Sequence, residues 1–146
     1  MDIYTDGSCR KNKVGAFGFV VVVGGKVFLS FGKREEATTN NIMELKGVLA
    51  ALNYIKKTKY ANVSIYCDSE YVVKGYNRWI HAWKANNWIG STKKPVANRQ
   101  IWEQLDSVRT ELEAEAIEPN LSWVRGHDGT EFNEYVDNVV QTISAY

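Results

Sequence analysis

The chain has 146 residues, of which 45% are hydrophobic and 24% charged, and its net charge of +1 arises from 18 Lys+Arg against 17 Asp+Glu. This length and balance predict one globular domain spanning residues 1–146, with a core large enough to fold unaided. There is no apolar run long enough to span a membrane and no signal-like segment before Asp6, so we expect a cytoplasmic, monomeric protein without membrane contacts.

The first part of the chain predicts three consecutive antiparallel strands. Residues 1–6 read as a short buried strand, and residues 15–23 form a strongly β-prone run. Gly24-Gly25 is a two-residue hairpin signal, after which residues 26–31 return with alternating apolar side chains. A meander of three strands is the simplest interpretation.

The next part predicts a crossover helix and a parallel strand. Residues 38–41 are typical of a helix start, and apolar residues then recur at helical spacing as far as Ile55. Residues 63–67 alternate as in a strand, and Asp68 follows. Because a crossover helix joins parallel strands, we expect this strand to lie beside the first one.

The remaining chain predicts three helices and one more strand. Residues 70–88 form an unusually aromatic helical stretch, and Asn98 is positioned to cap a helix that runs to about residue 115. Residues 121–124 follow as a last strand, and residues 131–143 as a closing helix. The predicted fold class is therefore α/β, with one mixed five-stranded sheet flanked by helices.

Two aspartates are expected to emerge side by side from this sheet. Asp6 ends the first predicted strand and Asp68 ends the fourth, and parallel neighbours release their carboxyl ends at one edge. Each aspartate alone would be an ordinary turn residue. Two like charges this close are costly unless a cation or a proton intervenes.

Two further acids extend the cluster, and each has a simpler explanation. Glu44 shares a helical face with apolar residues that point to the sheet, although Asn41 and Glu44 also have capping-box spacing. Asp137 borders the apolar face of the closing helix, where an aspartate would normally face solvent. With Asp6 and Asp68 nearby, we favour a cluster of four acids.

Four oxygen donors without a Cys/His ligand set favour a hard cation, Mg²⁺ or Mn²⁺, over zinc. Two such ions can activate water on one side of a phosphodiester and stabilise the leaving oxygen on the other. His127, on a loop with glycine on both sides, is a candidate for proton relay, whereas His81 has no such context and is interpreted as structural. Two cysteines, Cys9 and Cys67, predict free thiols in a reducing compartment, with a bridge between them possible in principle.

At this point the chain resembles type 1 ribonuclease H over nearly its whole length. The resemblance rests on five ordered stretches: Tyr4-Thr5-Asp6-Gly7-Ser8-Cys9; Thr39-Asn40-Asn41-Ile42-Met43-Glu44-Leu45; Asp68-Ser69-Glu70-Tyr71-Val72; Trp79-Ile80-His81-Ala82-Trp83-Lys84 with Lys93-Lys94-Pro95-Val96; and Trp123-Val124-Arg125-Gly126-His127 with Asn133-Glu134 and Asp137. Each is a modest signal, and all five in order are specific.

The resemblance implies a ribonuclease H-like fold and cleavage of the RNA strand of RNA/DNA hybrids, leaving 5′-phosphate and 3′-hydroxyl ends. It implies that the four acids hold two Mg²⁺ ions (Mn²⁺ being possible), with Asp6 bridging them, and that His127 assists proton transfer or product departure. The substrate contacts that it implies are Cys9, Asn12, Asn40, Asn41 and Glu70 toward the minor groove and RNA 2′-hydroxyls, Thr39 and Asn98 at a DNA phosphate, and Trp79 along the DNA channel.

The chain departs from the family pattern at three places. Lys11-Asn12-Lys13 stands where a Gly-Asn-Pro turn is common, and Glu70 stands where a glutamine is usual. The protrusion that many bacterial members use to grip the hybrid supplies only Lys84 in residues 84–88, which predicts weaker binding. Compensation is expected from other basic residues, namely Arg10, Lys11, Lys13, Lys93, Lys94 and Arg99.

Other functions compete with the nuclease. A catalytically weak hybrid-binding module would be expected to lack at least one of the four acids, and all are present. A small-molecule phosphatase built on Asp6 would want a second carboxylate two residues later, where Ser8 stands. The chain is also compatible with service as the ribonuclease partner of a polymerase.

Overall fold

The computed structural model of the chain describes residues 1–125 and 131–145. Its secondary-structure elements, in chain order, are β1 (Asp2–Cys9), β2 (Gly15–Val23), β3 (Lys26–Glu35), α1 (Asn40–Thr58), β4 (Ser64–Cys67), α2 (Glu70–Lys74), a π-helical turn (Gly75–Trp79), α3 (Ile80–Ala85), α4 (Arg99–Ala114), β5 (Asn120–Trp123) and α5 (Glu131–Ser144). None of the helices in these ranges is long and apolar enough to cross a membrane.

The five strands form one mixed sheet in the order β3-β2-β1-β4-β5. Strands β1, β2 and β3 pair antiparallel, while β4 pairs parallel to β1 and β5 parallel to β4. The predicted α/β class and the mixed five-stranded sheet are confirmed, as is the placement of the fourth strand beside the first.

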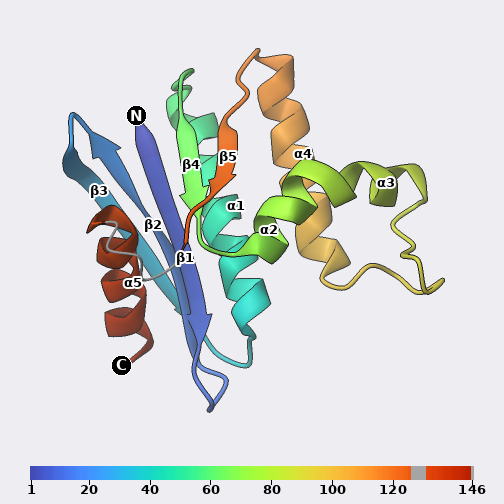
Figure 1. Cartoon of the computed structure of the whole chain (residues 1–146), viewed down its shortest axis with the longest axis horizontal. Coiled ribbons are helices and arrows are strands. Elements are labelled where there is room, and N and C mark those ends of the chain that lie inside the picture. The colour runs from blue at the N-terminus through green and yellow to red at the C-terminus, as the bar shows by residue number, and fades with distance from the viewer. Residues whose placement is uncertain (126–130, 146) are drawn as a thin grey trace.

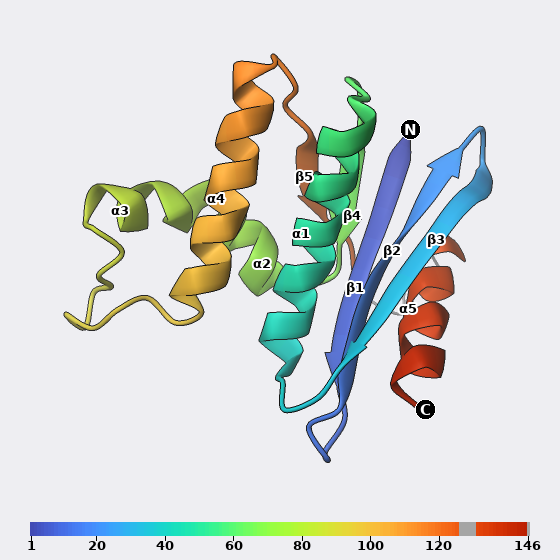
Figure 2. The same cartoon turned by 180° about the vertical axis from the view of Figure 1, so that it is seen from behind.

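Helices cover both faces of this sheet (Figures 1 and 2). Helix α1 packs on β1 and β2, with α4 beside it, and α5 packs on the opposite face against β1, β2 and β3. The larger core cluster, which includes Leu52, Ile65 and Trp102, lies on the α1 side, and a smaller one of Val20, Val22 and Val136 lies under α5. Helix α3 and the loop after it extend away from the sheet (Figure 1).

Two strands are longer than the apolar pattern predicts. β1 continues past Asp6 to Cys9 because its antiparallel pairing with β2 extends to Cys9 opposite Gly15. β3 likewise continues to Glu35 opposite Gly15. Asp6 is therefore inside a strand rather than at its end, although the parallel pairing with β4 stops one residue earlier, at Thr5 opposite Cys67.

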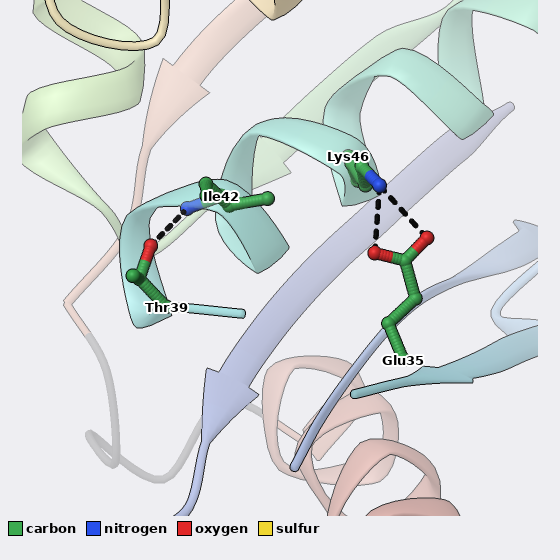
Figure 3. A network of polar contacts seen from close by, with 4 residues as sticks. All are labelled: Glu35, Thr39, Ile42 and Lys46. Carbon is green, nitrogen blue, oxygen red and sulfur yellow. Dashed lines mark hydrogen bonds and ion pairs between the residues drawn. The ribbon is translucent and has the colours of Figure 1, made fainter. Parts of the chain in front are cut away.

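Helix α1 begins two residues earlier than the capping-box alternative requires. Thr39 is the N-cap, and its Oγ1 accepts a hydrogen bond of 3.2 Å from the backbone N–H of Ile42 (Figure 3). Glu44 thus lies beyond the first turn, and the interpretation of Asn41 and Glu44 as a capping box is wrong. Lys46, in the next turn, donates to both carboxylate oxygens of Glu35, which joins α1 to the end of β3 (Figure 3).

The aromatic stretch is helical over residues 70–85 but contains a π-helical turn at Gly75–Trp79. The ring of Trp102 occupies the space in which a side chain at position 75 would lie, so α4 packs closely there. Tyr76 and Ile80 are buried, whereas Trp79 remains 39% exposed. His81 is also exposed rather than part of the packed interior.

Asn98 occupies the N-cap position of α4, as predicted, but its side chain does not cap the helix. Asn98 precedes α4 and has a left-handed φ of 59°, but its side chain makes no capping hydrogen bond. Its Nδ2 donates instead to the hydroxyl oxygen of Tyr71 at 3.2 Å, and Trp102 Nε1 donates to the same oxygen at 3.1 Å. The amide therefore links α4 to α2.

Candidate active site

The parallel register of β1 and β4 brings Asp6 and Asp68 to the same level of the sheet. Thr5 pairs with Cys67, and each aspartate is the next residue of its chain. Asp6 is buried, at 5% exposure, whereas Asp68 is partly exposed just beyond the end of β4. The indole Nε1 of Trp123 donates to the backbone oxygen of Asp68 at 3.1 Å, which holds the turn after β4 against β5.

Close packing of α1 on β1 brings Glu44 to the same place. A Cβ atom at Gly7 would overlap the backbone of Met43 and Glu44, and a Cβ atom at Gly47 would lie 2.9 Å from the carbonyl oxygen of Asp6. Only glycine permits this approach at either position. Glu44 consequently lies near the carboxyl groups of Asp6 and Asp68, and burial together with their negative charges raises its pKa.

Asp137 approaches from the other side of the sheet. It belongs to α5, which packs on β1, and its carboxyl group lies near enough to that of Asp6 to raise the pKa of Asp6. Asp137 is partly exposed, consistent with its position at the border of the apolar face. The structure thus brings together Asp6, Glu44, Asp68 and Asp137 from β1, α1, the end of β4 and α5.

This gathering of acids perturbs the protonation of the innermost two. Burial, followed by the negative charge of Asp68 and the contact with Asp137, raises the pKa of Asp6 from 3.8 to about 8. Burial, followed by the charges of Asp6 and Asp68, holds the pKa of Glu44 well above its usual value. Gathering like charges in a buried place therefore disfavours the ionised form of both carboxyl groups, and a bound cation would offset this cost.

Three of the four acids each have one buried carboxylate oxygen without a hydrogen-bond partner among the described residues. Asp6 Oδ2, Glu44 Oε1 and Asp68 Oδ1 are shielded from solvent and lack a hydrogen-bond partner within residues 1–125 and 131–145. An unsatisfied buried carboxylate oxygen is costly in a folded protein. A hard divalent cation, which prefers oxygen ligands, fits this set of donors.

The sequence prediction missed one neighbour of this cluster. Cys67, fully buried at the end of β4, lies with Glu44 and Asp68 so that one ligand-type atom of each falls within 4.8 Å of the other two. Its position directly before Asp68 was the available signal, but strand alternation alone places it in the core. Cys9 and Cys67 are both free thiols, as predicted.

The comparisons with known proteins agree with this geometry. A family model described as RNase H matches residues 1–144. The chain is 41% identical over 140 residues to a ribonuclease H of Chromobacterium violaceum, which covers 95% of this chain and 90% of that protein. It is 45% identical over 139 residues to a ribonuclease H of Cupriavidus metallidurans, which covers 92% and 88%. The chain belongs to the ribonuclease H family.

The fold of this ribonuclease H family member also matches a solved relative. The crystal structure of LC9-RNase H1, a type 1 ribonuclease H with the type 2 active-site motif, superimposes with a TM-score of 0.80 at 27% identity, over 99% of this chain and 71% of that one. The resemblance found from the sequence is therefore confirmed at the level of family and fold. His127, the expected proton relay, lies outside the described residues.

All the predicted minor-groove contacts except Glu70 lie around the start of α1. Oδ1 of Asn40 accepts from the backbone N–H of Cys9 at 2.6 Å, and the thiol of Cys9 contacts the carbonyl oxygen of Thr38 at 3.4 Å. Oδ1 of Asn12 accepts from the N–H of Val14, which closes the β1–β2 turn. These bonds hold the turn beside the N-terminus of α1, where Thr39 and Asn41 are also exposed.

The remaining predicted contacts lie elsewhere and have partners of their own. Glu70 is exposed at the start of α2 and forms an ion pair with Lys74 at 3.1 Å. The ring of Trp79 lies between those of Tyr71 and Trp83, at centroid distances of 6.2 and 5.9 Å. Asn98 is held by Tyr71, as described above. The structure thus divides the predicted substrate residues between the start of α1 and the α2–α4 side.

Several of the basic residues expected to compensate for the thin protrusion have intramolecular partners. Arg10 donates to Ser144 Oγ at 3.1 Å and to the Gln141 carbonyl oxygen at 3.0 Å, and Arg99 forms an ion pair with Glu103. The single protrusion lysine, Lys84, forms an ion pair with Asp106 at 3.1 Å. Lys93 and Lys94 are exposed and form no ion pair with any residue that the structure describes.

Proposed function

We propose that this chain is a divalent-metal-dependent endoribonuclease that cleaves the RNA strand of an RNA/DNA hybrid, leaving 5′-phosphate and 3′-hydroxyl ends, and that residues 1–146 act as one catalytic domain and as a monomer. The observation that carries the proposal is the set of enclosed, unpartnered oxygens on Asp6, Glu44 and Asp68. The names of its relatives support the same class of reaction.

The four acids have distinct roles in this proposal. Asp6, the most buried of them, would contribute to both of two bound Mg²⁺ ions, and Glu44, Asp68 and Asp137 would supply the other protein ligands. When bound, two such ions would activate a water for attack on the phosphodiester and would stabilise the leaving oxygen. The protein supplies the fixed positions of these carboxylates, which come from β1, the residue after β4 and the two packed helices α1 and α5.

Proton movement and substrate selection fall to other residues. His127 would carry a proton near neutral pH, as an imidazole can. Asn12, Asn40, Asn41, Cys9 and Glu70 would contact the minor groove and the 2′-hydroxyls that distinguish RNA from DNA, with Thr39 and Asn98 at a DNA phosphate and Trp79 along the DNA channel. Asn40 is already ordered by its bond to Cys9, so that part of the surface is preorganised.

The decisive experiment compares cleavage of a labelled RNA/DNA hybrid, duplex RNA and duplex DNA, each with Mg²⁺ or with EDTA. We expect cleavage of the hybrid's RNA strand alone, and only with the metal. Asp6→Asn should abolish it, whereas Asp2→Asn, a matched change at the far end of β1, should not. Binding of the hybrid without cleavage would instead identify a catalytically weak binding module, and cleavage by Asp6→Asn would refute the assigned site.

A further inference from the structure

A thiol lies directly below the acid cluster and has no role in the proposed reaction. Cys67 Sγ and one carboxylate oxygen each of Glu44 and Asp68 lie within 4.8 Å of one another. The sulfur is fully buried, and the carboxylate oxygens Glu44 Oε1 and Asp68 Oδ1 are enclosed and unpartnered among the described residues. One soft and two hard ligand atoms therefore lie close together.

This mixed ligand set differs from the one that magnesium prefers. Mg²⁺ takes oxygen ligands and has little affinity for sulfur, whereas Zn²⁺ and Cd²⁺ bind thiolates readily. Bonds of about 2.3 Å to sulfur and about 2.0–2.2 Å to oxygen bring the ligand atoms of a tetrahedral site to about 3.5 Å apart. The three ligand atoms, all within 4.8 Å of one another, must move closer together to reach that separation.

From this juxtaposition we propose that Glu44, Cys67 and Asp68 form a site for a thiophilic divalent cation, Zn²⁺ or Cd²⁺. The thiol proton leaves to solvent as the metal–sulfur bond forms. The backbone N–H of Ser69, which lies 3.5 Å from Cys67 Sγ, remains as a donor to the resulting thiolate. Asp68 is partly exposed, so it lies on the solvent side of the buried sulfur.

Occupation of this site has a consequence for catalysis, and this part of the inference rests on the proposed function. Glu44 and Asp68 are two of the four acids assigned to the magnesium pair, so a zinc ion held by Cys67 withdraws both of them. Zinc should therefore inhibit magnesium-supported cleavage by competing for ligands rather than by blocking the substrate surface.

The binding site is tested by spectroscopy on the metal-free protein. In a Cys9→Ser background, where Cys67 is the only thiol, titration with Cd²⁺ should produce the ultraviolet charge-transfer band of a cadmium–thiolate bond and saturate at one ion per chain. Adding Cys67→Ser should remove the band, with Cys67→Val as the replacement if the serine variant does not fold. Absence of the band in the Cys9→Ser protein, or its persistence without Cys67, would overturn the proposal.

The carboxylates are tested in the same background. Glu44→Gln should weaken Cd²⁺ binding, followed by the same band, about tenfold or more. Glu113→Gln, the same change at an exposed position on α4, should leave the affinity unaltered. Equal affinities in these two variants would mean that Cd²⁺ binds a lone thiol, and the proposed site would be wrong.

The catalytic consequence is measured separately. Cleavage of the hybrid is measured with Mg²⁺, and each variant's rate is normalised to its own zinc-free rate. The Zn²⁺ concentration for half-inhibition should be about tenfold or more higher for Cys9→Ser/Cys67→Ser than for Cys9→Ser. Equal sensitivity would refute the competition. If no variant cleaves the hybrid, the proposed function fails, while the cadmium titration still decides whether the site exists.

Discussion

No side chain fits between Gly7 and Glu44, because the backbone of α1 at Glu44 lies where a Cβ atom of residue 7 would be. This contact sets the height of α1 above β1 and so places the Glu44 carboxylate beside that of Asp6. The glycine after the first aspartate is therefore a packing requirement of the site, in addition to any role in chain direction.

Gly7→Ala should consequently destabilise the protein and impair the site. The added methyl group meets backbone atoms, which cannot rotate away, so we expect a loss of about 3 kcal/mol in the free energy of unfolding and a large loss of cleavage. The measurement is denaturant unfolding with a parallel cleavage assay. Gly90→Ala is the control, since the nearest atom to its Cβ is 3.6 Å away, and it should change stability by less than about 0.5 kcal/mol.

The raised pKa of Asp6 predicts how stability depends on pH in the absence of metal. The folded protein retains a proton on Asp6 up to about pH 8, whereas the unfolded chain releases it near pH 3.8. Between these values the folded state binds more protons, so its stability is greatest at low pH and falls as the pH rises. In EDTA we expect the free energy of unfolding to fall by about 2 kcal/mol or more from pH 5 to pH 9.

Asp6→Asn should remove much of this dependence. The amide carries no charge, so the variant should be more stable than the parent at pH 9 and show a smaller difference at pH 5. The pH dependence of the free energy of unfolding is measured by urea unfolding at several pH values in EDTA. Asp2→Asn, the same change outside the acid cluster, is the control. If the stability of the unsubstituted protein rises from pH 5 to pH 9, the assignment of the raised pKa to Asp6 is wrong.

Divalent metal should stabilise the parent protein by relieving the same repulsion. At 100 times its Kd, Mg²⁺ should add about 2.7 kcal/mol to the free energy of unfolding, seen as a higher Tm. Asp6→Asn and Glu44→Gln should respond less, because each removes an anionic ligand from the cluster. A shift of equal size in Asp6→Asn would show that the stabilising ion binds elsewhere.

Lys93 and Lys94 are expected to hold the hybrid, because both are exposed and neither has an ion-pair partner among the described residues. Their double replacement by alanine should weaken binding and flatten the slope of log affinity against log salt by about one to two units. Lys84→Ala should change the slope less, since Lys84 is already paired with Asp106. Equal slopes in the parent and the double variant would exclude these lysines as phosphate contacts.

His127→Ala should slow turnover without eliminating it, because general acid–base groups typically contribute about 10²–10⁴-fold while the acids supply the metal chemistry. Single-turnover and steady-state rates on the hybrid separate the chemical step from product departure. His81→Ala, at an exposed position on α3, is the control. Complete loss of cleavage in His127→Ala alone would mean that its role has been misassigned.

The amino-acid pattern alone determined the elements and their order. The β-prone run that became β2 and the Gly24-Gly25 hairpin were readable because side-chain alternation and turn preference are local properties. The intervening crossover helix predicted that β1 and β4 lie side by side and parallel. This pairing brings Asp6 and Asp68 together. The acids Glu44 and Asp137 could be proposed, but only as members of a cluster that other residues already indicated.

Tertiary structure decided what depends on partners distant in sequence. β1 extends past Asp6 because β2 continues to pair with it, and Asn98 bonds to Tyr71 because α4 packs against α2. The depth of α1 depends on two glycines that meet backbone from other elements, and the approach of Cys67 to Glu44 depends on that depth. Such contacts leave no periodic trace in the sequence, since each is fixed by the close packing of segments that are far apart along the chain.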